Sequence, residues 1–413
     1  MPDPLDRGNN RGNGEPLRGV RVLDFTRILS GPYCTLLLSD LGADVIKVER
    51  KPYGDDTRLW GPPFLDEEHG ISTYYAALNR GKRSISLDLQ VSEGRELLEK
   101  LISKVDVVLE NFRPSTADSL GLDHPSLSAL NPAIVSCSIS GFGSSGPYAK
   151  FPGTEIVVEG MSGLMEVTGP ADGDPVRFGI AMVDIATGLT AATRIIAALL
   201  QARSTGQGVH VGCSLYGTAL AALGTLITSY SATKEEPRRW GSHHPSICPY
   251  GGFPTADGYI ITGAINDAMW PKLCEALHLD DLAQRSRLAT NAGRVHHRKE
   301  VEQAISDQCA TRPTSYWLER LRARGLLGAP IRTVGQAVED PVTREMGLFV
   351  ELSGHPGVLS PRLDNVLAHS GVENVPRLGE HTVEVLTELL DMELSTIQVL
   401  ERLGILHTGR GAS

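Results

Sequence analysis

The sequence predicts a globular α/β fold built around a parallel sheet. The first half of the 413-residue chain alternates short β-branched runs with amphipathic stretches, which is the pattern of repeated βαβ units. The chain contains 44 glycines, so many turns are expected. Hydrophobic residues make up 41% and charged residues 21%, an ordinary balance for a globular protein. The length suggests two or three domains, or one large domain with an insertion.

The first βαβ unit is predicted near the N-terminus. A strand over Gly19–Phe25 is followed by a helix over Tyr33–Leu41 and by a second strand over Gly42–Glu49. Pro32 precedes the helix, where its missing N–H costs nothing because the first amides of a helix have no partner within it. Two strands joined by such a crossover helix run parallel.

The same alternation continues toward the middle of the chain. Strands are predicted over Arg83–Asp88, Val105–Glu110 and Ala133–Ser140, with an amphipathic helix over Glu93–Lys104. The last strand leads into the glycine-rich Gly141–Pro147. The apolar stretch from Ile180 to Ala202 is interrupted by Asp184 and Arg194, which favours a buried helix over a membrane span.

The pattern changes after about Gln207. The elements predicted there are a helix over Leu215–Ala232, a long loop over Arg238–Gly251, a hairpin over Phe253–Gly263 with Asp257-Gly258 as its turn, and helices from Trp270 to about Arg324. From Pro330 onward we expect the chain to lead back toward the first domain.

Charge and cysteine usage narrow the class of protein. Lysine and arginine number 39 against 49 aspartates and glutamates, a net charge of −10, and aromatic residues make up 5%. A nucleic-acid binder would need a basic face or stacking rings, so none is expected. The six cysteines are scattered, without C-x-x-C pairs or zinc spacing, which predicts a cytoplasmic protein with no metal site. Residues 1–16 are polar, lack the apolar core of a signal peptide, and predict a disordered arm.

Common catalytic motifs are absent. The first strand ends in Thr26-Arg-Ile-Leu-Ser-Gly-Pro32, which is not the G-x-G-x-x-G of a dinucleotide fold, and there is no P-loop or G-x-S-x-G. Adjacent histidines such as His243-His244 do not share a helix face, so they are taken as loop residues before ligands. Asp172-Gly-Asp174 hints at calcium but lacks the glutamate at the twelfth loop position. By composition alone it is a polar turn.

A series of motifs resembles the family III CoA-transferases, which include formyl-CoA transferase, carnitine CoA-transferase and the α-methylacyl-CoA racemases. These motifs are Leu23–Cys34, Leu41–Glu49, Asn79–Ser84, Glu110–Pro114, Ser140–Gly143, Met161–Met165, Thr168–Gly173, Asp184–Gly188, Trp240–Tyr250, Phe253–Gly258 and Leu378–Thr382. Each motif is weak alone, but their order and spacing are specific from about Pro16 to Gly404.

The resemblance implies a divided architecture. A Rossmann-like large domain would consist of residues 17–205 together with the return segment within 329–413. Residues 206–224 would form a linker helix, and residues 225–328 a smaller inserted α+β domain. Members of the family form interlocked homodimers, so the same assembly is expected here.

The resemblance also implies a catalytic residue, Asp172, in the run Thr168-Gly-Pro-Ala-Asp172. A carboxylate can attack an acyl-CoA thioester and then carry CoA as an aspartyl thioester, which splits one difficult exchange into easier steps. The partners would be an acyl-CoA and a carboxylic acid, with no permanently bound cofactor. Oxyanion stabilisation is assigned to Gly251 and Gly252. His243 and His244, with Arg239, could receive an acidic acceptor, although a solvated or dimer-contacting loop is the simpler interpretation.

Binding of CoA is implied for a further set of residues. They are Arg27, Ile28, Leu29, Arg50, Leu87, Asn111, Phe112, Phe142 and Glu155. Arg50 would contact the nucleotide, and Ile28 and Leu29 the thioester end. Leu87 and Phe142 could instead be plain core residues, and Arg50 could pair with an exposed carboxylate. A basic position of the formyl-CoA transferase pattern is Ser119 here, and the net negative charge requires a local basic patch for the anionic CoA.

Three alternative functions stay open. Racemisation next to the thioester needs two opposed acid–base groups. The racemase His-Asp pair falls on Thr154-Glu155; Thr154 cannot be a base, and Glu155 would have a hydrogen-bonding role. Asp184 matches a racemase aspartate, although helix capping is the favoured role. Intramolecular CoA transfer and a non-catalytic CoA-binding scaffold are the others; a scaffold has no need of Asp172.

Overall fold

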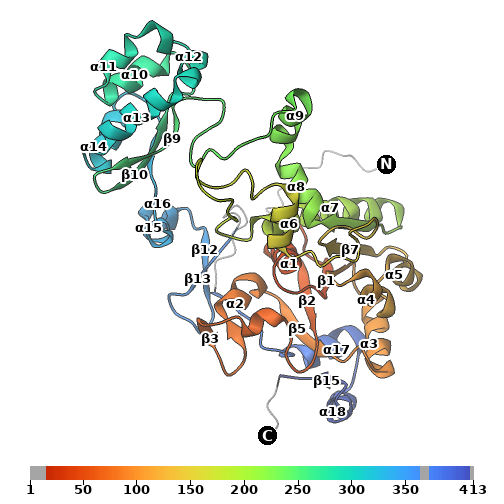
Figure 1. The fold of residues 1–413 in the computed structure, drawn as a ribbon. Helices are drawn as coiled ribbons and strands as arrows, with labels where there is room; N and C mark the ends of the chain where they lie inside the picture. The colour runs from red at the N-terminus through yellow and green to blue at the C-terminus, as the bar shows by residue number, and fades with distance from the viewer. Residues whose placement is uncertain (1–14, 363–371, 410–413) are drawn as a thin grey trace, which may run out of the picture. The chain divides into compact units, whose positions relative to one another are not determined.

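The computed structural model describes residues 15–362 and 372–409. The predicted N-terminal arm lies outside the described residues up to position 14. The chain forms two compact units (Figure 1). Of the described residues, the first unit holds those up to Ser162, Phe178–Ile227 and those from Arg344 onward, and the second holds Gly163–Arg177 and Thr228–Thr343. The short segment Gly163–Arg177 therefore packs with the second unit, although it lies inside the stretch 17–205.

A seven-stranded sheet forms the centre of the first unit. Its strands are β1 (Arg21–Asp24), β2 (Asp44–Glu49), β5 (Arg83–Leu87), β6 (Val107–Glu110), β7 (Val135–Ser140), β8 (His210–Ser214) and β15 (Leu406–His407). They lie in the order β15-β5-β2-β1-β6-β7-β8, parallel except for β15, which runs antiparallel to β5. The predicted parallel α/β sheet is confirmed. The order from β5 to β8 is that of a doubly wound fold, whose switch point falls between β1 and β6.

Helices cover both faces of this sheet, so β1, β2, β5, β6 and β7 are buried along most of their length, polar residues included. The helices of the first unit are α1 (Ser30–Asp40), α2 (Thr73–Asn79), α3 (Ser92–Ile102), α4 (Pro114–Ser119), α5 (His124–Leu130), α6 (Glu155–Ser162), α7 (Met182–Thr205), α8 (Leu215–Ala222), α17 (Thr382–Leu390) and α18 (Leu394–Arg402). Side chains of α3, α5, α17 and α18 share one hydrophobic core with β2 and β5.

Helix α7 packs against α1 and against strands β7 and β8. Gly188 permits this close approach, because a Cβ there would lie 2.7 Å from the backbone oxygen of Ser30. Within the described residues α7 is the helix that is long and apolar enough, by length and composition, to cross a membrane. Its face formed by Ala191, Ile195 and Leu199 is buried against protein, as expected for a core helix.

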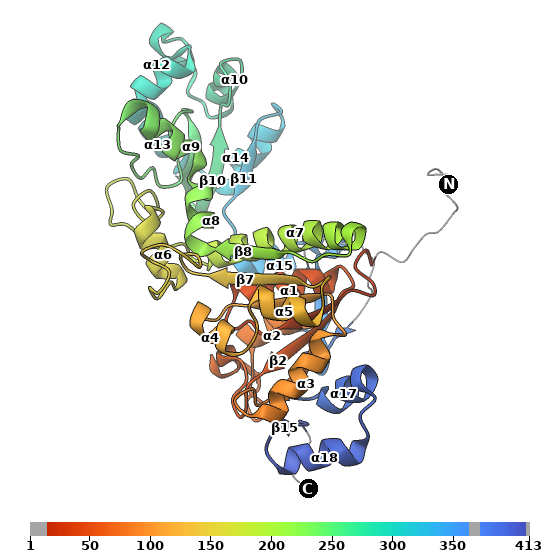
Figure 2. The same ribbon diagram turned by 90° about the vertical axis from the view of Figure 1, so that its right-hand side faces the viewer.

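The C-terminal segment completes the first unit. Leu406 of β15 pairs with Leu87 of β5 at the edge of the sheet. Figure 2 shows α17 beside α3, although the two helices come from opposite ends of the chain. Two small sheets also belong to this unit: β3 (Phe64–Asp66) with β4 (Ile71–Ser72), and β12 (Phe349–Leu352) with β13 (Leu359–Pro361) and β14 (Val372–Glu373).

The second unit is built on an antiparallel hairpin. Its elements are β9 (Tyr250–Thr255), β10 (Gly258–Gly263), α10 (Met269–Ala276), α11 (Asp280–Ala283), α12 (Asn291–His296), α13 (Arg298–Cys309), α14 (Thr314–Arg322), β11 (Gly328–Pro330) and α15 (Val334–Glu339). Figure 1 shows α10–α14 gathered around the hairpin. Trp270 and Trp317 are fully buried in its core.

Two sequence predictions are corrected in this region. Thr255 pairs with Gly258, so the turn consists of Ala256 and Asp257 and lies one residue earlier than predicted. The Asp257 carboxylate accepts hydrogen bonds from the backbone N–H and the hydroxyl of Thr314, which fixes this position. The single helix predicted over Leu215–Ala232 is divided into α8 and α9 (Gly224–Thr233); Leu223 ends α8, and a glycine, a weak helix former, begins α9.

Candidate active site

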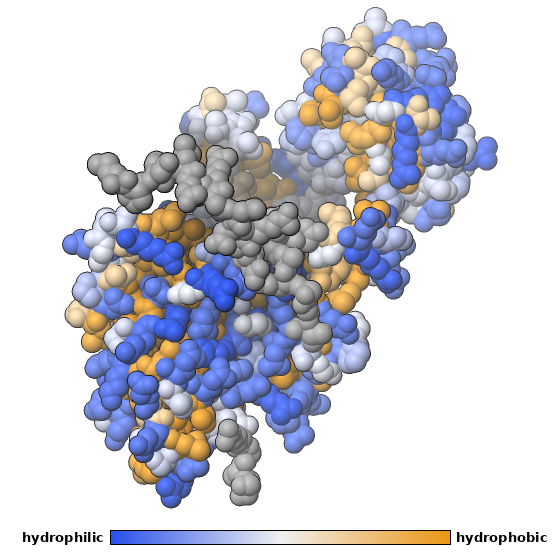
Figure 3. Space-filling view, turned by 180° about the vertical axis from the view of Figure 1, so that it is seen from behind, coloured by the Kyte–Doolittle hydropathy of each residue, from blue (hydrophilic) through white to orange (hydrophobic). Residues whose placement is uncertain are grey.

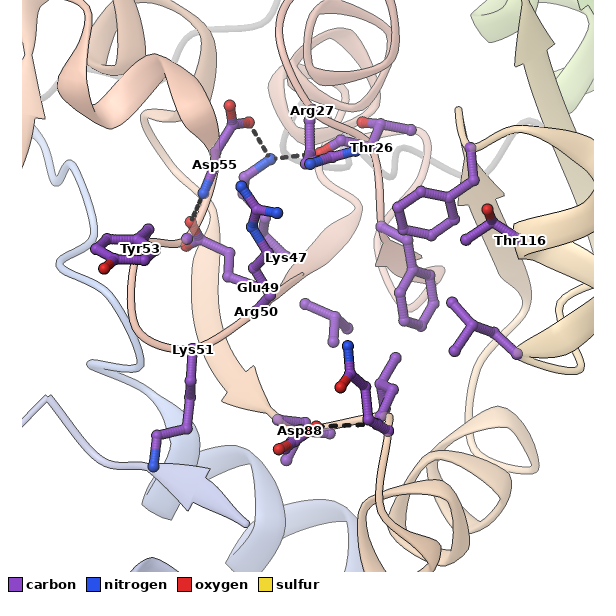
Figure 4. Close-up of a pocket in the computed structure, with 18 of the residues that line it drawn as sticks. Thr26, Arg27, Lys47, Glu49, Arg50, Lys51, Tyr53, Asp55, Asp88 and Thr116 are labelled. Carbon is purple, nitrogen blue, oxygen red and sulfur yellow. Dashed lines mark hydrogen bonds and ion pairs between the residues drawn. The ribbon is translucent and has the colours of Figure 1, made fainter. Parts of the chain in front are cut away.

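A cavity of about 750 Å³ opens at the carboxyl ends of the parallel strands, beside the switch point. It is lined by residues that follow four strands of the sheet: Phe25, Thr26 and Arg27 after β1; Val48, Glu49, Arg50, Lys51, Tyr53, Gly54 and Asp55 at and after β2; Leu87, Asp88, Leu89 and Gln90 after β5; and Phe112, Thr116, Ser119 and Leu120 after β6, with Lys47 and Arg95. The wall thus combines cations with apolar side chains (Figure 4).

Four of the nine residues assigned to CoA line this cavity. Arg27, Arg50, Leu87 and Phe112 line it, as does Ser119. The Arg27 guanidinium lies over the Phe112 ring, 5.6 Å from its centroid. Leu87 is 2% exposed, so it belongs to the hydrophobic core as well as to the lining of the cavity.

Arg50 is exposed and forms an ion pair with Asp56 at 2.7 Å. Arg27 contacts the same carboxylate at 3.2 Å. Asp56 therefore holds two cations at the rim of the cavity. An anionic group entering the cavity would meet cations already gathered at its rim.

Ile28, Leu29 and Asn111 adjoin the cavity without belonging to its lining. Asn111 binds the backbone of Arg27 with both ends of its amide: its oxygen accepts from the Arg27 N–H at 3.0 Å, and its nitrogen donates to the Arg27 carbonyl at 2.8 Å. Leu29 is buried and precedes α1, whereas Ile28 is 39% exposed. Asn111 thus links the loops on the two sides of the switch point.

Buried charges in the wall of the cavity were not predicted. Lys47 forms an ion pair with Asp55 at 2.9 Å (Figure 4). Glu49 accepts two hydrogen bonds from Arg58, at 2.8 and 2.6 Å, so its carboxylate is held by this arginine. Burial alone would raise the pKa values of Asp55 and Glu49, but Lys47 and Arg58 hold each pKa below its usual range. The sequence does contain one indication of these buried charges: Lys47 lies between two apolar residues of β2, a strand that is covered on both faces.

Phe142 lies in an aromatic cluster of the first unit. Its ring centroid is 5.5 Å from those of Tyr148 and Tyr216 and 6.0 Å from that of Phe151. The preceding Gly141 packs against Gly153, where a Cβ would lie 2.4 Å from the Gly153 Cα. A second cavity, of about 500 Å³, is lined by neighbouring residues of this loop, including Ser140 and Gly143.

Asp172 lies exposed on a turn of the second unit. Val176 N–H donates to the Thr168 carbonyl at 3.3 Å, which closes the loop that carries Asp172. Gly169, with φ +121°, brings the loop against the loop over Arg238–Gly251, since its carbonyl accepts from Gly241 N–H at 2.9 Å. The structure therefore brings the predicted catalytic loop and the predicted specificity loop together within one unit.

Side chains of the specificity loop are held by neighbours in the second unit. The His243 ring lies 3.2 Å from a Glu302 oxygen and packs edge-on against Phe253. Arg239 pairs with Glu166 at 2.8 Å. His244 Nδ1 accepts from the N–H groups of Ser246 and Ile247. These contacts engage part of the polar atoms that were expected to receive an acceptor acid; the buried Arg239 Nε has no hydrogen-bond partner among the described residues.

The two glycines assigned to the oxyanion belong to strand β9. Gly251 stands opposite Thr262, and a Cβ on it would lie 2.4 Å from the His243 ring. The Gly252 N–H donates to the Ser242 hydroxyl at 3.3 Å. Gly251 is therefore needed to make room for His243.

The two acidic residues considered for racemisation, Glu155 and Asp184, accept hydrogen bonds within the first unit. Glu155 begins α6 and accepts from the Val183 N–H at 3.1 Å, in the first turn of α7. Asp184 lies in that same turn without capping it, and it accepts a hydrogen bond from the Ser30 hydroxyl. Burial raises the pKa of Asp184 to about 6. Thr154, directly before α6, carries no basic group.

Metal ligands are not assembled in the part of the chain that the structure describes. No group of three or more His, Cys, Asp or Glu side chains within residues 15–362 and 372–409 is placed to hold an ion. All six cysteines are buried as free thiols.

The fold and the cavity define a doubly wound α/β protein with a ligand site at the carboxyl edge of its parallel sheet. The family described as CoA-transferase family III matches residues 17–382. The chain therefore belongs to the family III CoA-transferases, and it is an enzyme of that family.

The chain is similar to curated relatives over nearly its full length. The chain is 38% identical to succinyl-CoA:glutarate CoA-transferase of Homo sapiens, covering 96% of this chain and 91% of the relative. It is 40% identical to succinate–glutarate CoA-transferase of Agrobacterium fabrum, covering 92% and 96%. Among solved structures, a CAIB/BAIF family protein from Brucella suis is 39% identical with a TM-score of 0.82, covering 91% of this chain and 100% of that one.

Proposed function

We propose that this enzyme moves CoA from succinyl-CoA to a second dicarboxylic acid of similar length, with glutarate as the first candidate. The observation that carries the proposal is the similarity, at 38% and 40% identity over more than nine-tenths of the chain, to two enzymes named for succinate and glutarate. A relative from Haloarcula hispanica, 35% identical, is named for succinyl-CoA and mesaconate. The names share succinate and differ in the second acid.

The proposed chemistry begins at Asp172. Its carboxylate attacks the thioester carbonyl and releases the CoA thiolate, which leaves a mixed anhydride. The thiolate then attacks the aspartyl carbonyl, so that the donor acid departs and CoA remains on Asp172 as a thioester. The acceptor carboxylate reverses these two steps and leaves as the new acyl-CoA. Water must be excluded, because both intermediates hydrolyse.

The CoA moiety is assigned to the cavity of the first unit. Arg50, Lys51 and Arg95 supply cations for its phosphates, and Leu87 and Phe112 supply apolar surface for adenine or pantetheine. The protein has a net charge of −10, so its overall field repels an anion and attraction must come from this local group. Ser119 lines the same cavity at a position that is basic in the formyl-CoA transferase pattern. Arg95 supplies a cation to this cavity that Ser119 cannot supply.

The assembly and compartment are proposed with the function. We expect an interlocked homodimer in the cytoplasm, with a large domain over residues 17–205 and within 329–413 and a small domain over 225–328. Figure 3 shows apolar patches among hydrophilic residues on the surface. Leu200, Ile227 and Ile265 are 67%, 41% and 53% exposed, and burial of such residues favours association.

Racemisation receives less support than transfer. It needs a base on each face of the substrate, and Thr154 supplies none. Asp184 faces the Ser30 hydroxyl and is largely buried. A scaffold without activity would not require the exposed Asp172.

Trapping of the enzyme intermediate tests the proposal. The protein is incubated with succinyl-CoA, glutarate and hydroxylamine, and its peptides are examined by mass spectrometry. Hydroxylamine should convert Asp172 to a hydroxamate, and Asp172→Ala should lose transfer activity by at least a thousandfold, since covalent catalysis depends on this carboxylate. Asp174→Ala, which removes an exposed carboxylate two residues away, is the matched control and should stay active. Full transfer by Asp172→Ala would disprove the mechanism.

A further inference from the structure

The loop that follows β1, Thr26–Ile28, is held by side chains at every backbone polar atom from Thr26 N to Ile28 N. We name it the β1 loop. The Thr26 N–H donates to Asp24 at 2.9 Å, and the Thr26 carbonyl accepts from the Lys47 ammonium at 2.7 Å. Asn111 takes both the N–H and the carbonyl of Arg27. The Ile28 N–H donates to Asp55 Oδ1 at 3.3 Å.

The backbone of Ile28 is in a conformation that its side chain disfavours. Its φ is +73°, in the left-handed region. A β-branched residue rarely adopts this conformation, because its Cβ crowds the backbone, and such residues persist only where their surroundings enforce them. The left-handed turn redirects the chain from the cavity wall, where Thr26 and Arg27 lie, into α1, which begins at Ser30.

Lys47 and Asp55 make contacts that hold the β1 loop in this conformation. Each is 1% exposed, and their charged atoms are 2.9 Å apart. Figure 4 shows the Lys47 ammonium between Asp55 and the backbone beside Thr26. Asp55 is oriented in turn by the N–H and the hydroxyl of Thr57, at 3.0 and 2.8 Å. The pair thus holds both ends of the β1 loop, Thr26 and Ile28.

A buried ion pair is a costly way to stabilise a fold. Apolar residues of similar volume often serve as well or better, because removing two charges from water carries a penalty that their attraction barely offsets. What charged groups add is a fixed hydrogen-bonding geometry, which a ligand site requires. This pair directs its bonds to the backbone of a cavity wall, where such geometry has a use.

We infer that Lys47 and Asp55 are positioning residues, which keep Ile28 left-handed and so preset the cavity wall that receives the acyl-CoA. The inference rests on the proposed function, since it assumes that CoA occupies this cavity. With the wall preset, binding does not have to order the loop, and that lowers the KM for acyl-CoA. Without the pair, Ile28 relaxes and the wall formed by Thr26 and Arg27 moves.

A double-mutant cycle between Asp55 and Ile28 tests the inference. Asp55→Asn should raise the KM for succinyl-CoA and the Kd for free CoA about tenfold, with kcat changed less than threefold. Ile28→Gly removes the strain, because glycine adopts positive φ freely. Combined with Asp55→Asn, it should recover at least threefold of the lost affinity. Thr57→Val, which only loosens Asp55, is the milder second variant and should raise KM about threefold.

The matched control is Asp40→Asn, which breaks the ion pair of Asp40 with the buried Arg80 outside the cavity. It should lower the melting temperature and leave KM unchanged. Equal KM values for Asp55→Asn, Thr57→Val and the wild type, or no recovery by Ile28→Gly, would overturn the positioning role. Arg50→Ala separates the two proposals: an unchanged KM in that variant overturns the CoA site itself, whereas a raised KM there with unaltered Asp55 variants overturns the positioning role alone.

Discussion

At the scale of single residues, Asp184 shows how burial changes the behaviour of a carboxylate. Its surroundings raise the pKa from 3.8 to about 6, mainly through burial, with the Ser30 hydroxyl acting against this. The folded state therefore binds the proton more tightly than the unfolded state between about pH 4 and 6. Stability falls as the pH rises through this window, and above it the ionised carboxylate destabilises the fold by up to about 3 kcal/mol.

Asp184→Asn should remove this titration. The variant keeps an oxygen for Ser30 but carries no charge, so at pH 7.5 it should be more stable than the wild type by about 1–3 kcal/mol. Urea unfolding at pH 4 and pH 7.5 measures the difference, which should shrink at the lower pH. The exposed Asp174→Asn is the control and should change neither value. A stability gap independent of pH would contradict the assignment.

Some roles of single residues could not be predicted from the residues alone. Asp172 is proposed as catalytic through a resemblance, because on composition alone Asp172-Gly-Asp174 is a polar turn. Lys47 and Asp55 were missed for a different reason. Asp55 is ordinary in its own segment, and the position of Lys47 between apolar residues does not identify its partners. Their role follows from contacts with the β1 loop, which only the folded chain brings within reach.

At the scale of elements, the helix pair α1 and α7 depends on one glycine. The two helices approach closely at Gly188, where a Cβ would lie 2.7 Å from the Ser30 oxygen and 3.2 Å from the Cys34 nitrogen. Those neighbours are backbone atoms of α1, which cannot turn aside as a side chain can. A substitution must therefore separate the helices.

Gly188→Ala should destabilise the protein by about 1–3 kcal/mol through overpacking, although alanine is the better helix former. Thermal unfolding measures the loss. Gly335→Ala is the matched control, since Gly335 lies in α15, where a Cβ finds its nearest neighbour at 4.0 Å. That variant should be neutral or slightly stabilised. Equal effects of the two substitutions would show that the contact of α1 with α7 is not tight.

Elements were predictable where the local pattern was strong. The strands that became β1, β2, β5, β6 and β7 are buried along most of their length, and each was predicted near its observed position. Strand β8 was not predicted: it is partly exposed, and it pairs with β7 at the edge of the sheet.

At the scale of the whole molecule, the strand order follows from contacts distant in sequence. Parallel βαβ units predicted the class of sheet, but nothing local in Leu406-His407 indicates that they form an antiparallel edge strand on β5. The C-terminal helix α17 likewise gives Val385 and Leu386 to the core that the N-terminal strands form. Residues from opposite ends of the chain thus share one cooperative structure.

Leu386→Ala tests whether α17 and the N-terminal strands depend on the same hydrophobic core. The side chain is fully buried, so its truncation should cost about 2–5 kcal/mol. Because the lost contacts belong to the core of the first unit, hydrogen exchange should accelerate in α3 and β5, although these elements lie at the other end of the chain. Exchange in β9 and β10 should stay unchanged. Leu321→Ala, which truncates an equally buried leucine in the core of the second unit, should give the reverse pattern. If both variants accelerated exchange in the same elements, the two units would unfold as one, and the chain could not be treated as two bodies with separate cores.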